Sequence, residues 1–202
     1  MPDNGAMTHA TSNPPSNPTS IPTARRIAGV DGLLELLDAA RNERDGEPVD
    51  LLAHGLQCAA VLERTVPDDL ELQVAGLVHD LGTVLCPGRP SEHACAGATA
   101  LAPLLGARVA TLVAGHDLAK RYLVTVDAAY RDRLTPRSLA TLRAQGGLLD
   151  PEERAAFLNR PDADALVALR HADDAAKDPE RTPAGLDHWT LALYAVAATA
   201  RP

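Results

Sequence analysis

Four of the seven histidines and two of the aspartates in this 202-residue chain each lie within or beside an apolar stretch. His79 and Asp80 stand next to each other inside the short run LVHDLG. Imidazole nitrogens and carboxylate oxygens bind transition metals, and a helical bundle can gather such side chains around two ions. The sequence therefore predicts a two-metal site, whose candidate ligands are His54, His79, Asp80, His93, His116 and Asp173.

Each of these residues, taken alone, also has a plainer interpretation. A histidine beside an apolar face is often a core or surface residue satisfied by a hydrogen bond. The His79–Asp80 pair is harder to explain in that way, because a buried carboxylate without a partner costs several kcal/mol. A metal ion is one partner that satisfies both side chains, so the combination favours a metal site more than any single residue does.

The segments that carry these residues show the spacing of apolar positions typical of amphipathic helices, and no convincing strand pattern is present. We expect an all-α domain, a helical bundle of about eight or nine helices over residues 25–202 with the two-metal site in its core. Residues 1–24 are rich in Pro, Ser, Thr and Asn and are predicted to be a disordered tail. Helices are predicted over 27–42, 48–65, 68–82, 91–106, 107–123, 136–145, 150–159, 163–177 and 186–200.

Composition excludes several classes of function. The net charge of −8 argues against a protein that binds the phosphate backbone of nucleic acids. The three cysteines form no CxxC pair, which makes a thiolate zinc site improbable and favours free thiols in a reducing compartment. No basic-then-apolar signal is seen at the start, and no apolar run is expected to reach the roughly 18 residues of a membrane span. We therefore expect a cytoplasmic protein that binds neither nucleic acid nor membrane.

The order of these ligands resembles the HD-domain superfamily in its two-metal form. Longer stretches resemble the phosphonate-cleaving HD oxygenases, which are mixed-valent di-iron enzymes of the glycine-forming 2-amino-1-hydroxyethylphosphonate dioxygenase type. The resemblance covers about residues 28–195. It is carried by the stretches GEPVDLLAHGLQCA, HDLG, HDLAKRYLV, QGGLLDPEE and RHADDAAKDP.

The resemblance implies a role for each metal ligand. His54, His79 and Asp173 would hold one iron, and His93 and His116 would hold the other. Asp80 would bridge the two ions, because a carboxylate has two oxygens to share. The cofactor implied is a pair of Fe ions in the Fe(II)/Fe(III) state.

The resemblance also implies residues that hold the substrate. Lys120, Ser138 and Arg170 match positions that grip a phosphonate group, and Lys120 follows His116 by four residues, on the same helical face. Glu47 matches a carboxylate that shapes the amine end of the pocket. Glu47 and Lys120 are therefore the candidate catalytic residues.

Two positions depart from the glycine-forming pattern. Arg44 stands where that enzyme has a tyrosine that reaches the iron, and Thr83 stands where it has a histidine that ends an HDxGH motif. Both positions are near the substrate rather than among the metal ligands. The reaction class is therefore expected to hold, and the identity of the substrate remains open.

The function implied is cleavage of the C–P bond of a small 1-hydroxyphosphonate by O2, with release of phosphate. The partners would be a small anionic substrate and O2. The alternative is a metal-dependent HD phosphohydrolase that acts on a nucleotide or another phosphate ester through Mn, Zn or Mg, using the same histidines and aspartates. Dependence on oxygen separates the two.

Overall fold

The computed structural model describes residues 27–200, and every regular element in that range is a helix. The all-α prediction is therefore confirmed, whereas the predicted disordered tail over 1–24 lies outside the described residues. The helices are α1 (Gly29–Ala39), α2 (Leu51–Thr65), α3 (Leu70–Val78), α4 (Gly82–Leu85), α5 (His93–Val126), α6 (Ala128–Asp132), α7 (Pro136–Ala144), α8 (Pro151–Leu158), α9 (Ala163–Ala175) and α10 (Leu186–Thr199).

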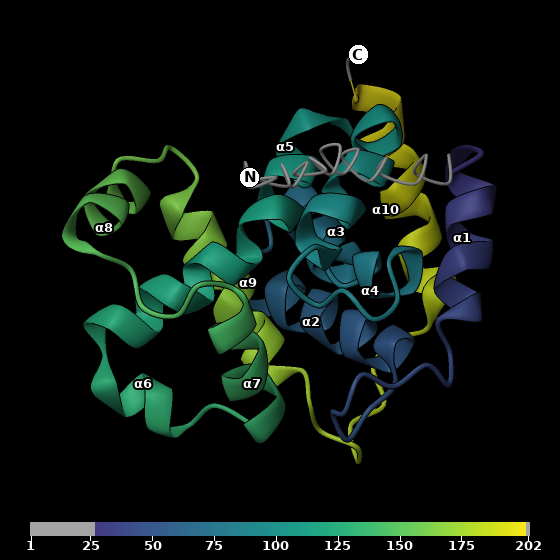
Figure 1. Ribbon diagram of the computed structural model, residues 1–202. Helices are drawn as coiled ribbons and strands as arrows, with labels where there is room; N and C mark the ends of the chain where they lie inside the picture. The colour runs from purple at the N-terminus through teal and green to yellow at the C-terminus, as the bar shows by residue number, and fades with distance from the viewer. Residues whose placement is uncertain (1–26, 201–202) are drawn as a thin grey trace, which may run out of the picture.

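The main core lies where α2, α3, α5 and α9 pack against one another, with α1 and α10 closing one side (Figure 1). Leucines that are wholly removed from water, such as Leu62, Leu112 and Leu169, fill this core. Helices α6, α7 and α8 lie on the other side, where α6 and α7 contribute to a smaller apolar cluster around Tyr130 and Leu142 and Phe157 of α8 joins the main core. Burial of these apolar faces is what holds the polar site residues in place.

Aspartate side chains cap the N-termini of α2 and α8. The side chain of Asp50 accepts a hydrogen bond from Ala53 N at 2.8 Å, so α2 starts at Leu51 rather than at the predicted Pro48. The predicted start of α8 is confirmed: Asp150 and Glu153 form a capping box, and proline occupies the first turn.

Helix α5 contains a break in its backbone. Gly106, at φ 84° and ψ 171°, interrupts the helical geometry, which agrees with the two helices predicted over 91–106 and 107–123. Pro103 lies inside the first of these helices, three residues before the break. Glycine tolerates a positive φ that other residues avoid, so the direction of the chain changes at Gly106.

By length and composition α5 is apolar enough to cross a membrane, contrary to the expectation from the sequence. Half of the apolar stretch is buried within the protein. The many alanines and glycines of α5 raise its average hydropathy although no long run of large apolar residues is present. The same composition is typical of a core helix that neighbouring helices approach closely.

The helix predicted over 68–82 ends earlier, at Val78. His79 is its C-cap and keeps helical dihedral angles, and Asp80 lies in the turn that leads to α4. Gly82 explains this arrangement, because a Cβ atom at that position would lie 1.8 Å from the carbonyl oxygen of His93. The missing side chain therefore lets the start of α5 approach the His79–Asp80 turn.

Candidate metal centre and pocket

Four buried imidazoles converge at the centre of the bundle. His54 comes from α2 and His79 from the C-cap of α3, whereas His93 is the first residue of α5 and His116 lies in the second half of that helix. The Nε2 atoms of His54 and His79 are 3.3 Å apart, and those of His93 and His116 are 3.0 Å apart. The four histidines predicted from the sequence are thus brought together as two pairs.

Backbone carbonyls set the orientation of each ring. The Nδ1 atoms lie at hydrogen-bond distance from carbonyl oxygens, at 2.9 Å for His54 and His79 and at 2.7 Å for His93 and His116. With Nδ1–H donating to a carbonyl, the lone pair of a neutral ring is on Nε2. Four neutral rings in this arrangement would face one another with lone pairs and no donor, a situation that protons or metal ions on Nε2 relieve.

Asp80 lies between the two pairs. Its Oδ2 atom is 3.5 Å from Nε2 of both His54 and His79. Its Oδ1 atom is 3.3 Å from Nε2 of His93 and 3.6 Å from Nε2 of His116. Each oxygen therefore faces a different histidine pair, and the donor atoms of each resulting trio lie within 4.8 Å of one another. One carboxylate in this position can bridge two ions.

Asp173 completes the cluster from α9. Its Oδ1 atom lies 3.3 Å from Nε2 of His54, and the carboxylate also contacts Arg170 at 2.6 Å and Lys177 at 3.3 Å. The sixth predicted ligand is therefore beside the His54–His79 pair, as expected. Arg170 holds the Oδ2 atom, and Lys177 contacts the same Oδ1 atom that faces His54.

The electrostatics of the cluster favour ionised carboxylates. Burial would raise the pKa of Asp80, but the surrounding histidines, His79 first, hold it well below its usual value. Burial would likewise raise the pKa of Asp173, yet Arg170 and Lys177 lower it strongly. Both side chains are therefore deprotonated, as metal ligands must be.

The histidines differ in their affinity for protons. Burial would lower the pKa of His54 and His93, but Asp173 beside the first and Asp80 beside the second raise both pKa values to about 9. Burial lowers the pKa of His116 to about 4. In the absence of metal, protons on Nε2 of His54 and His93 therefore carry the positive charge that metal ions would bring to the same positions. Six side chains that offer nitrogen and oxygen donors of this kind fit two transition-metal ions.

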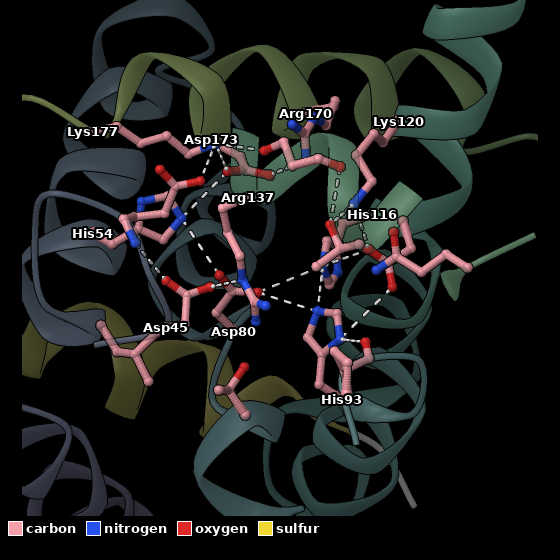
Figure 2. A pocket seen from close by; sticks show the side chains of 18 of the residues that line it. Asp45, His54, Asp80, His93, His116, Lys120, Arg137, Arg170, Asp173 and Lys177 are labelled. Atoms are coloured by element: carbon pink, nitrogen blue, oxygen red, sulfur yellow. Dashed lines mark hydrogen bonds and ion pairs between the residues drawn. The ribbon is translucent and has the colours of Figure 1, made fainter. Parts of the chain in front are cut away.

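A pocket of about 200 Å³ opens beside the metal cluster (Figure 2). The predicted substrate residues Lys120, Ser138 and Arg170 all line it, and all three are buried. Lys120 Nζ donates to Thr141 Oγ1 at 2.8 Å, and burial lowers the pKa of this lysine. The structure therefore brings the expected anion-binding groups to the same cavity as the metal cluster.

The guanidinium group of Arg170 already makes several hydrogen bonds within the protein. Its guanidinium donates to Asp173, to Asp174 and to the hydroxyl of Tyr130. Its direct contact with a substrate stays a prediction. Within the described residues its evident structural role is to hold Asp173 beside His54.

The two departures from the glycine-forming pattern lie in different places. Arg44 is exposed, donates to the carbonyl oxygen of Pro48 at 2.7 Å and does not line the pocket. Thr83 and Glu47 do line it. Glu47 accepts a hydrogen bond from Thr135 at 2.7 Å, which holds its carboxylate at the pocket wall.

The pocket also contains residues that the sequence analysis did not single out. Asp117 lies 3.4 Å from Nε2 of His116, and a second His-Asp doublet in the sequence was the signal for it. Lys177 and Arg137 add two cations to the wall. Gln145 lines the pocket with a buried amide that no protein group in residues 27–200 hydrogen-bonds. No pattern in the sequence distinguishes these last three from surface residues.

Comparison with known proteins identifies two relatives. The chain is 33% identical over 156 residues to the glycine-betaine-forming 1-hydroxy-2-(trimethylamino)ethylphosphonate dioxygenase of Leisingera caerulea, and the match covers 73% of this chain and 78% of the relative. It is 35% identical over 157 residues to the hydroxymethylphosphonate dioxygenase of Gimesia maris, with the same shares of the two chains covered. No family model matches the chain. The two relatives, together with the His/Asp cluster, show that the chain belongs to the family of metal-dependent HD-domain phosphonate dioxygenases.

Proposed function

We propose that this protein is a di-iron HD-domain oxygenase that cleaves the C–P bond of a small 1-hydroxyphosphonate and releases phosphate. The observation that carries the proposal is the position of Asp80, with one oxygen toward each histidine pair and a cation-lined pocket beside them. Both relatives are named as dioxygenases of 1-hydroxyphosphonates, which supports the same reaction class here.

The proposed ligand sets follow the two trios. His54, His79 and Asp173 hold one ion, His93 and His116 hold the other, and Asp80 is shared. Iron bound in this way supplies the oxygen-dependent redox chemistry. The second ion has fewer protein ligands, so room is left for the substrate and O2.

The side chains around the cavity bind and orient the substrate. Lys120 places its ammonium among Thr141 and the other polar groups of the wall, where a phosphonate oxygen replaces solvent. Ser138 and the amide of Gln145 offer neutral hydrogen-bond donors to the same group. Buried donors fixed before the substrate arrives need little reorganisation, which favours binding of one orientation.

The overall reaction is balanced without an external reductant. A 1-hydroxyphosphonate and one O2 give one carboxylic acid and one phosphate. The C–P bond breaks, C1 is oxidised from an alcohol to an acid, and the four electrons reduce O2. One oxygen atom enters each product.

The test uses the full chain loaded with Fe(II) under argon and given hydroxymethylphosphonate, the trimethylamino analogue or a phosphate ester. Phosphate release from a phosphonate that requires O2, with one O2 consumed per phosphate, would support the proposal. Release of phosphate from the ester under argon would contradict it and favour the phosphohydrolase. Lys120→Met is expected to raise the KM for the phosphonate, whereas exposed Arg143→Met, outside the pocket, is the matched control.

A further inference from the structure

Two carboxylates stand on the pocket wall on either side of one glycine. Asp45 and Glu47 both line the cavity, and Gly46 between them has a φ of 105°, which glycine adopts without strain. Carboxylates in such a position could attract a positively charged substituent of the substrate. Whether they do depends on the cations already beside them.

Asp45 is paired with Arg137, which comes from α7. The Nε atom of Arg137 lies 3.3 Å from Oδ2 of Asp45. The aliphatic part of the arginine packs over Gly46, because a Cβ atom there would be 3.6 Å from Cδ of Arg137. Figure 2 shows the Arg137 side chain pointing into the pocket next to Asp45. A Cβ atom would fit beside the arginine, so the positive φ is what favours glycine at this position.

Glu47 is paired with Lys177. The Nζ atom of Lys177 lies 3.7 Å from Oε1 of Glu47, and the hydroxyl of Thr135 donates to the same oxygen. Both charged side chains are about nine-tenths buried, at 10% and 9% exposure. Water screens a charge pair less at such a depth than at the surface. Lys177 also lies 3.3 Å from Asp173 and 3.4 Å from Asp174, so it counters the negative charge of Glu47 as part of a shared cluster.

We infer that these two pairs make the pocket select 1-hydroxyphosphonates whose substituent on C1 carries no positive charge, and that Arg137 is a specificity-determining residue. A cationic substituent beside Asp45 and Glu47 would meet the like charges of Arg137 and Lys177. It would also lose its own hydration without gaining an unpaired carboxylate. An uncharged substituent meets neither cost. The inference rests on the proposed function and concerns the same pocket.

The test compares two ligands of equal shape and different charge. One is 1-hydroxy-2-(trimethylamino)ethylphosphonate, and the other is 1-hydroxy-3,3-dimethylbutylphosphonate, in which a carbon replaces the cationic nitrogen. Binding to the iron-loaded full chain is measured by calorimetry under argon, where no turnover occurs. We expect the neutral ligand to bind about tenfold more tightly, the order expected for one unfavourable charge contact in a partly exposed site.

Two variants identify the residues responsible. Arg137→Met leaves Asp45 without its cation, so the ratio of the two dissociation constants should shift about tenfold toward the cationic ligand. Adding Asp45→Asn to that variant should abolish the shift, since the freed carboxylate causes it. Arg143→Met, an exposed arginine on the same helix, should leave the ratio unchanged.

The outcomes separate this inference from the proposed function. Tighter binding of the cationic ligand by the wild-type protein, or an unchanged ratio in Arg137→Met with normal metal content and circular dichroism, would overturn the inference alone. Oxygen-dependent phosphate release from either ligand would still support the oxygenase in that case. Failure of the iron-loaded protein to bind either phosphonate would overturn both.

Discussion

The Nε2 atoms of His93 and His116 lie 3.0 Å apart, while both Nδ1 atoms are at 2.7 Å from backbone carbonyls. Two ring nitrogens at this distance need a proton or a metal ion between or beside them. The raised pKa of His93 and the lowered pKa of His116 show that one ring of this pair takes up a proton in the metal-free protein. The same arrangement explains why metal binding and proton binding should compete.

Metal binding is expected to release protons at neutral pH. His54 and His93 have pKa values of about 9, so both rings are protonated at pH 7 and must lose a proton before Nε2 can bind a metal. About two protons per chain should be released at pH 7, and the number should fall as the pH approaches 9. Calorimetry in buffers of different ionisation enthalpy gives this number. Release of no protons at pH 7 would contradict it.

The stability of the metal-free protein should depend on pH through the same two histidines. Their pKa values rise from 6.5 to about 9 on folding, so their contribution to the free energy of unfolding is complete below pH 6.5 and is lost as the pH rises through 9. Urea unfolding of metal-free protein between pH 6.5 and 9 measures it. His54→Gln should reduce the loss. If the free energy of unfolding of the variant depended on pH as steeply as that of the wild type, the assignment of this dependence to His54 would be wrong.

Asp80→Asn is expected to impair both metal sites at once. The amide keeps the shape of the side chain but replaces one of the two oxygens that face the two histidine pairs. Metal content by mass spectrometry should fall from two ions per chain to fewer than one. His79→Gln, which touches one trio only, should retain one ion. Full occupancy in Asp80→Asn would refute a shared ligand.

Gly82→Ala should disturb the metal centre through packing. The added methyl group would meet the carbonyl oxygen of His93 at 1.8 Å, so α5 must move away from the His79–Asp80 turn. We expect a loss of about 1–3 kcal/mol in the free energy of unfolding, together with reduced metal content. Gly32→Ala is the control, because its nearest neighbour would be 3.6 Å away and a helical alanine is stabilising by roughly 0.5–1 kcal/mol.

Gln145→Leu should separate binding from stability. The amide of Gln145 has no hydrogen-bond partner among the described residues, so its removal should leave the urea midpoint nearly unchanged. Binding of a phosphonate should weaken by roughly ten- to a hundredfold once the amide no longer donates to it, since one hydrogen bond to a charged group is worth roughly 1.5–3 kcal/mol. Calorimetry and urea unfolding give the two quantities. A destabilised protein with unchanged binding would assign Gln145 a structural role.

Much of the helical fold could be predicted from the order of residues. The spacing of apolar positions indicated most of the helices, and Asp150 followed by Pro151 marked the start of α8 because helix capping is a local interaction. The single turns α4 and α6 were missed. They have four and five residues, which is too short for an apolar period to show.

The sequence by itself determined which residues were candidates for the metal site. Histidines and aspartates recurring beside apolar stretches, together with the resemblance to HD oxygenases, pointed to His54, His79, Asp80, His93, His116 and Asp173. Residue type is enough for this step, because few side chains bind transition metals and their presence in apolar surroundings needs a partner.

Only the tertiary structure decided how the pocket is charged. Asp45 and Arg137 are 92 positions apart in the chain. Glu47 and Lys177 are likewise far apart in the sequence, one before α2 and the other after α9, although their side chains are in contact. Arg170, expected to grip the substrate, donates hydrogen bonds to Asp173, Asp174 and Tyr130. Charge pairing depends on distances between side chains after packing, and no local pattern in the sequence encodes those distances.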